Sequence, residues 1–236
     1  MVLMSRSTRW VVVSVVLALV VLLLAPFVYS ELTEGRTPPP LGLQSPGETS
    51  PAVESPAPGP FDVDGRWVVG PGSAAGFRAE RLGVPRDEAT VVGSTQDVTG
   101  AVEVVSGEAT TSRVEVATAT LTTGDAVEDA LLRRVLEVDV YPTSVFALTT
   151  PLDVTAVEDA PGPVLLEASG TLTLRDVTEP VTVALEVQRS GDGLQVDGAI
   201  AVRFSDYGIG APQLAPVEVR DEGTVEVSLA LSRSSG

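Results

Sequence analysis

Carboxylates are the side chains of this 236-residue sequence that could most readily carry acid–base chemistry, because Asp and Glu total 32 residues. Hydrolysis by paired carboxylates needs two acids that converge across a cleft, one of them with a raised pKa. Glu128 and Asp129 fall in a predicted helix, where consecutive residues point about 100° apart, so they belong to a solvated face. Glu137 and Asp139 stand in no motif that indicates burial. We therefore expect a protein that is not an enzyme.

Several kinds of site are excluded by residues that the sequence lacks. There is no His and no Cys, and all 15 basic residues are Arg. Without these residues there is no Ser-His-Asp triad, no Schiff-base lysine and no usual ligand set for zinc, haem or iron–sulfur clusters. Residues 62–65 (DVDG) match only the opening of a calcium loop. We expect no metal and no cofactor.

The formal net charge of −17 bears on partners. A surface this acidic repels the phosphates of nucleic acids and anionic lipid headgroups, and it favours solubility. We expect no nucleic acid partner, and the sequence identifies no protein partner.

The first 60 residues predict a membrane anchor and a spacer. Residues 10–29 are apolar except for Ser14, and about 20 such residues match the thickness of a bilayer core. Arg6 and Arg9 precede this run, which places the N-terminus in the cytoplasm and the rest outside it by the positive-inside rule. Residues 1–30 are thus expected to be a single-pass anchor, with a cleaved signal peptide as the alternative. Residues 31–60 are rich in Pro, Gly and Ser and predict a disordered linker.

Residues 61–236 predict one all-β domain. Short runs that alternate apolar and polar residues recur between Gly, Pro and Asp, which indicates a sandwich or a closed barrel. In residues 170–187 (GTLTLRDVTEPVTVALEV), two alternating stretches flank a polar RDVTEP turn, so they predict an antiparallel pair. Further runs include residues 112–121 and 144–152.

One amphipathic helix is expected within residues 124–138. Asp125 is its predicted N-cap, Glu128 its capping-box partner, and Asp129 and Arg133 form a predicted i, i+4 ion pair. Tyr141 and the proline after it are expected to stop the helix. Its apolar stripe should lie on the β structure.

The order of these landmarks resembles the YceI-like family, the polyisoprenoid-binding or lipid-binding YceI domains. The resemblance covers most of residues 61–235 and rests on RWVV, SAAGF, VTGAVEV, VEVATATLTTGD, LEVDVYPTSVFALT, ASGTLTLRDVTEPVTVALEV and VRFSDYGIG. It does not extend to the family's helical Arg-Asp pair and histidine, where Glu128 to Leu131 stand, nor to the His-Gly found where Arg175 and Asp176 stand. The polar contacts of a head group are therefore not carried over.

The resemblance implies an extended antiparallel, lipocalin-like β-barrel whose lumen holds a long isoprenoid or a similar amphiphilic lipid. The function expected is storage, shielding or transport of that lipid by an anchored extracytoplasmic protein. The alternative is an anchored structural or interaction module with a fully packed core, since eight strands enclose little more than their own side chains. The candidate lumen residues are Phe77, Leu131, Val135, Tyr141, Phe146, Leu172, Leu174, Val183, Leu185, Phe204, Tyr207 and Ile209.

Overall fold

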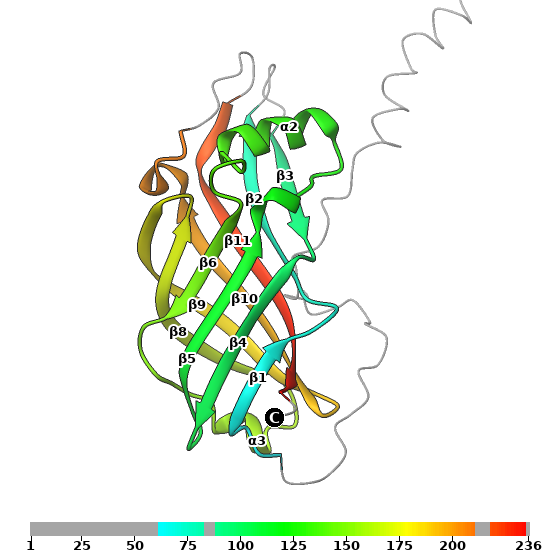
Figure 1. The fold of residues 1–236 in the computed structure, drawn as a ribbon, viewed down its shortest axis with the longest axis vertical. Coiled ribbons are helices and arrows are strands. Elements are labelled where there is room, and N and C mark those ends of the chain that lie inside the picture. The colour runs from blue at the N-terminus through cyan, green and yellow to red at the C-terminus, as the bar shows by residue number, and fades with distance from the viewer. Residues whose placement is uncertain (1–60, 83–87, 211–217, 235–236) are drawn as a thin grey trace, which may run out of the picture. The chain divides into compact units, whose positions relative to one another are not determined.

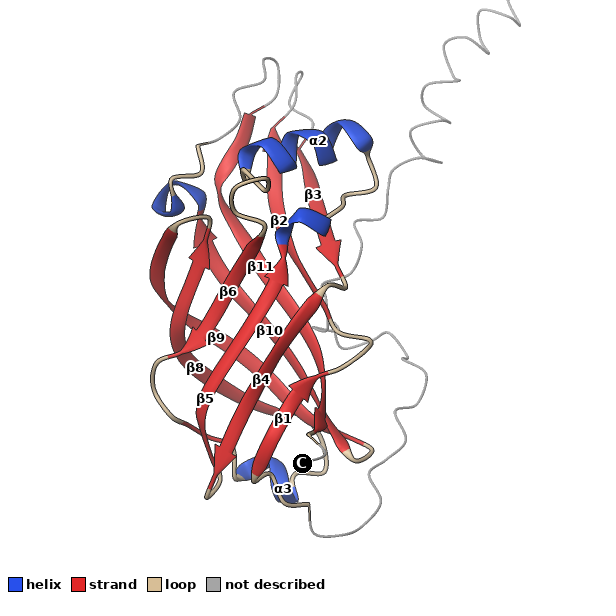
Figure 2. Cartoon of the chain, viewed as in Figure 1, coloured by secondary structure: helices blue, strands red, loops and turns tan. Residues whose placement is uncertain are grey.

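The computed structural model describes residues 61–82, 88–210 and 218–234 (Figures 1 and 2). The predicted anchor and the whole of the predicted linker lie outside these ranges. Within them, no helix has both the length and the apolar character needed to cross a bilayer. The strands are β1 (Gly65–Val69), β2 (Ala74–Leu82), β3 (Glu88–Thr95), β4 (Val98–Val105), β5 (Glu108–Ala117), β6 (Thr143–Leu148), β7 (Leu152–Asp153), β8 (Val164–Leu174), β9 (Val177–Ser190), β10 (Gly193–Arg203) and β11 (Glu218–Arg233).

Eight antiparallel strands close into a barrel, which confirms the all-β prediction and selects a barrel over a sandwich. The order is β1-β4-β5-β6-β8-β9-β10-β11, and β1 closes the ring by pairing with β11. Closure is possible because β11 has 16 residues, which is long enough to pair with both β1 and β2 along one of its edges. Its C-terminal part pairs with β1, and the part before that pairs with β2, which carries β3.

Strands β8 and β9 form the antiparallel pair expected from residues 170–187, but the turn is shorter than predicted. Only Arg175 and Asp176 separate the two strands, and Val177 to Pro180 already belong to β9. Arg175 adopts a left-handed conformation with φ 57°, as two-residue hairpin turns require. The predicted polar turn RDVTEP was therefore wrong over its last four residues.

Two other predicted runs are interrupted. The run 112–121 ends as a strand at Ala117 and continues as a 3-10 turn, η1 (Thr118–Thr120). The run 144–152 divides into β6 and β7, because the chain leaves the barrel between them and β7 returns to pair with β5. A one-turn helix that was not predicted, α3 (Ala156–Asp159), follows β7, and η2 (Phe204–Tyr207) follows β10.

The predicted helix is α2 (Ala126–Val135), and its N-cap is confirmed. The Asp125 carboxylate accepts hydrogen bonds from the backbone N–H groups of Val127 and Glu128 at 2.8 and 3.0 Å. The helix ends before Tyr141, because the chain turns into the left-handed region at Glu137 (φ 50°).

Two predicted side-chain pairings of α2 were wrong. Glu128 pairs with Arg81 of β2 at 2.8 Å instead of closing a capping box. Asp129 accepts hydrogen bonds from Thr122 and Thr123 instead of pairing with Arg133, which lies 3.7 Å from Asp139. Both carboxylates thus join the helix to the β structure and to the loop before it.

Candidate functional site

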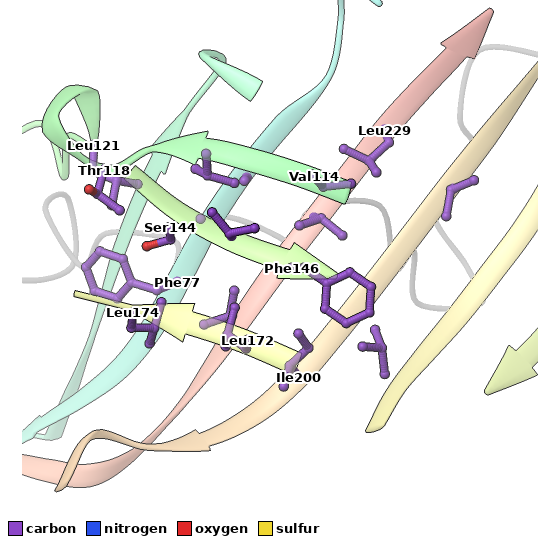
Figure 3. Close-up of a pocket in the computed structure, with 18 of the residues that line it drawn as sticks. Phe77, Val114, Thr118, Leu121, Ser144, Phe146, Leu172, Leu174, Ile200 and Leu229 are labelled. Carbon is purple, nitrogen blue, oxygen red and sulfur yellow. The ribbon is translucent and has the colours of Figure 1, made fainter. Parts of the chain in front are cut away.

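The barrel encloses a cavity of about 460 Å³, lined by strands around the ring, by α2 and by the segment around α3. Figure 3 shows part of this lining. Most lining side chains are Val, Leu, Ile, Ala or Phe. The volume falls in the range of roughly 300–1,000 Å³ typical of small-molecule sites. The interior is therefore open rather than filled by its own side chains.

Ten of the predicted lumen residues line this cavity: Phe77, Leu131, Val135, Phe146, Leu172, Leu174, Val183, Leu185, Phe204 and Ile209. The two tyrosines do not. Tyr207 packs among buried side chains near η2, and burial together with the charges of Glu179 and Asp206 raises the pKa of Tyr207. The Tyr141 ring lies 5.8 Å from the Arg175 guanidinium carbon. Neither ring is placed to meet a ligand in the lumen.

Each lumen phenylalanine lies over a glycine of a neighbouring strand. A Cβ added at Gly93 would come within 2.4 Å of the Phe77 ring, and one at Gly170 or Gly223 within 2.5 or 2.4 Å of the rings of Phe146 and Phe204. None of these three glycines has a positive φ, so their role here is space rather than backbone freedom. Phenylalanines laid against glycines in this way occupy the wall and leave the centre open.

One end of the cavity is closed by Trp67. This side chain is completely buried, and its indole N–H donates to the Val63 carbonyl at 2.7 Å. The Arg233 guanidinium carbon lies 4.8 Å from its ring, and Val157 of α3 is 1% exposed beside the same core. We call this closed end, formed by Val63, Trp67 and Val157, the floor.

Helix α2 covers the opposite end of the barrel (Figure 1). Its apolar stripe contributes Val127, Leu131, Leu132, Val135 and Leu136 to the cavity lining. None of the helix residues is buried, and Val127 is 78% exposed. This apolar face therefore lies beside open space rather than in a packed core.

Polar contacts hold α2 over the barrel. Arg81 and Glu128 form the ion pair described above, and Arg175 of the β8–β9 turn pairs with Glu137. Hydrogen bonds from Thr123 and Thr122 hold the pKa of Asp129 below its usual value. We call α2 with these contacts the cover.

The chemistry available in the cavity is limited. Its polar lining residues are Arg81, Ser112, Thr118, Thr123, Glu128 and Ser144. Among the described lining residues Glu128 is the one carboxylate, and it is paired with Arg81. What this arrangement can do is exclude water from a long apolar chain, since burial alone contributes about 0.8 kcal/mol per CH₂ group.

The sequence-based prediction missed the glycines under the phenylalanines, the floor and the lumen hydroxyls. A signal for the glycines was available, because an isolated Gly inside a strand pattern, as in VVGST or ASGTLTL, indicates close approach of another group. The floor and the hydroxyls depend on barrel closure and carried no comparable signal.

Comparisons with known proteins agree with this architecture. A polyisoprenoid-binding domain from Saccharophagus degradans, described as implicated in plant cell wall breakdown, aligns with a TM-score of 0.56 at 18% identity, covering 71% of this chain and 98% of its own. BcnA from Burkholderia cenocepacia aligns with a TM-score of 0.51 at 16% identity, covering 66% and 96%. At such identities the likeness concerns the fold. Among curated proteins, none matches.

The family resemblance noted in the sequence is confirmed by a direct match over most of the barrel. Residues 67–231 match the YceI-like domain, from the floor tryptophan to a point two residues before the end of β11. The chain belongs to the family of YceI-like domains.

Proposed function

We propose that this chain binds a long apolar lipid of the isoprenoid class inside its barrel and stores, shields or hands on that lipid without chemical turnover. The observation that carries the proposal is a single cavity of about 460 Å³ that reaches from the floor to the cover with an almost entirely apolar lining. A flexible hydrocarbon suits such walls, because each CH₂ group buried contributes about 0.8 kcal/mol. The polyisoprenoid-binding description of the Saccharophagus degradans neighbour supports this ligand class.

The alternative of a fully packed core is disfavoured by the same cavity. A packed β core leaves few voids larger than a water molecule. Here the three phenylalanine rings of the lumen wall lie against glycines.

The proposal includes anchoring to the cell membrane by residues 1–30, with the barrel outside the cytoplasm. Support for this part comes from the apolar run 10–29 and the arginines before it. A reporter that is active only outside the cytoplasm, fused after Ser30, should be active. Release of the shortened chain from the membrane would instead indicate a cleaved signal peptide.

The binding test is mass spectrometry of organic extracts from the purified full-length chain. Wild type should carry a long-chain lipid, and Leu131→Asp should lose it, because a carboxylate on the inner face of α2 would have to be desolvated against the lipid. Ala130→Asp is the matched control, since Ala130 is exposed on the outer side of the same helix. An extract free of lipid, together with no uptake of added isoprenoid, would overturn the proposal.

A further inference from the structure

Two serines of the lumen wall, Ser144 and Ser112, have no hydrogen-bond partner among the described residues, and Ser144 is the more deeply buried of the two. Ser144, at the start of β6, is 7% exposed and lines the cavity. Its hydroxyl has no hydrogen-bond partner within the described ranges, and its oxygen is not fully enclosed by protein but faces the cavity. In Figure 3 the oxygens of Ser144 and Thr118 stand among side chains that otherwise show only carbon. In an apolar cavity such a hydroxyl is satisfied only by a polar group of whatever occupies the cavity, water or ligand.

The other lumen hydroxyls near the cover already have acceptors. The Thr118 hydroxyl donates to the Tyr141 carbonyl at 3.1 Å. The Thr123 hydroxyl donates to the Asp129 carboxylate at 2.9 Å. Ser144 is thus the buried hydroxyl of this region whose donor remains available.

The position of Ser144 in the barrel shows how far from the cover a ligand oxygen bound to it would lie. Ser144 pairs with Val116 near the end of β5 that leads through η1 to the cover. Ser112, a second lining hydroxyl without a hydrogen bond to the described residues, lies nearer the other end of β5 and is only half-buried. A ligand oxygen that meets Ser144 would therefore leave the rest of the cavity, down to the floor, for an apolar tail.

Arg81, at the cover end of the cavity, limits what charge the ligand oxygen at Ser144 can carry. Arg81 is the one cation among the described lining residues, and it is ion-paired with Glu128 at 2.8 Å. A phosphate would have to displace this carboxylate and would meet it as a like charge. A neutral hydroxyl or carbonyl needs only the Ser144 hydrogen bond.

We infer that Ser144 donates a hydrogen bond to a neutral oxygen, a hydroxyl or a carbonyl, on the head of an isoprenoid-like ligand whose tail extends toward the floor. This inference rests on the proposed function. It names Ser144 as the residue that distinguishes an oxygen-bearing isoprenoid from a plain hydrocarbon of the same length.

The test is a competition for the full-length chain in detergent. The chain is incubated with equal amounts of geranylgeraniol and the hydrocarbon that lacks its hydroxyl, recaptured, washed and extracted for mass spectrometry. Comparing the bound ratio of wild type with that of each variant cancels the unequal partitioning of the two probes into micelles. Ser144→Ala should lower the alcohol-to-hydrocarbon ratio about 2–10-fold, the range expected for one neutral hydrogen bond. Ser144→Thr, which keeps the hydroxyl, should retain the wild-type ratio.

Ser112→Ala is the matched control, because it removes a second unpartnered hydroxyl from the same lumen. Its ratio should equal that of wild type, and thermal melts confirm that each variant is folded. If wild type and Ser144→Ala bind both probes at the same ratio, the inference fails while the proposed function stands. If wild type binds neither probe, the inference and the proposed function both fail. In a second competition, between geranylgeraniol and geranylgeranyl phosphate, preferential retention of the phosphate would overturn the neutral head.

Discussion

At the scale of single residues, side-chain size decides how much of the interior stays open. Lumen positions such as Val183 and Leu185 carry medium aliphatic groups, and the phenylalanine rings lie against glycines. A residue that is larger by one ring system should therefore occupy the space meant for ligand.

Leu185→Trp should block lipid uptake with little loss of stability. Leu185 is half-buried beside the cavity, so an indole can extend into empty space. Ala184→Trp, on the exposed face of the same strand, is the control and should bind lipid as wild type does. Lipid binding and thermal melts are measured on both. Unchanged binding by Leu185→Trp with a stability loss of about 1–3 kcal/mol would indicate a filled core instead.

Asp129 should make the stability of the cover depend on pH. Its folded-state pKa is lowered, first by the backbone N–H of Thr123 and then by the Thr122 hydroxyl. The stabilisation is therefore present above the unfolded pKa of about 3.9 and is lost as pH falls through the lower, folded value.

The Asp129 effect is measured by comparing melting temperatures of wild type and Asp129→Ala at pH 7, 5 and 3. Wild type should melt higher at pH 7 and 5, and the difference should shrink at pH 3. Asp139→Ala removes an exposed carboxylate beyond the far end of the helix and controls for net charge. A difference that is constant across pH would contradict the assignment.

At the scale of elements, the strands were largely predictable and their ends were not. Period-two alternation identified β8 and β9, because one face of each strand is buried along its length. The α2 N-cap was predictable because Asp125 acts within three residues. The partner of Glu128 was not, since Arg81 lies 47 positions away and meets it only after the barrel closes.

The candidate site residues divide in the same way, into those predictable from strand alternation and those that depend on the closed barrel. Phe146 and Leu172 alternate within strands and fell on the lumen face as predicted. Tyr207 is a predicted lumen residue that does not line the cavity, because it lies in the 3-10 turn η2, where period-two alternation does not apply. Nothing in the sequence around Ser144 separates it from other strand serines. Its burial in the lumen wall depends on neighbouring strands, which only the folded barrel brings together.

The pairing of phenylalanine with glycine across strands gives an element-scale prediction. Gly93→Ala should destabilise the barrel by about 1–3 kcal/mol, because the three atoms nearest to the new methyl all belong to the Phe77 ring, at 2.4–3.2 Å. Combining it with Phe77→Ala should remove this penalty, so a double-mutant cycle of unfolding free energies should show strong coupling. Gly162→Ala, which meets nothing within 4 Å, is the control. Additive effects would mean that the ring and the glycine do not share this space.

At the scale of the whole barrel, the cavity ties stability to lipid content. A ligand that binds only the folded state adds about 2.7 kcal/mol at a concentration of 100 times its Kd. For a domain of this size, the corresponding rise in Tm is roughly 5–10 °C.

We therefore expect the delipidated full-length chain to melt several degrees below the same chain reloaded with isoprenoid. Leu185→Trp, whose lumen is blocked, should melt at the same temperature with and without the lipid. A lipid-independent Tm in wild type would mean that the cavity is not the site of binding.

The buried floor also gives the molecule a built-in optical probe. Trp67 is one of only two tryptophans in the sequence, and Trp10→Phe would leave it as the single indole emitter. Because the ring borders the cavity, its fluorescence senses whatever reaches the bottom of the barrel. A bromine at the tip of an isoprenoid tail should quench this emission by contact, whereas a bromine beside the head group should leave it bright. The depth and the direction of the bound chain thus become readable from emission intensity in solution.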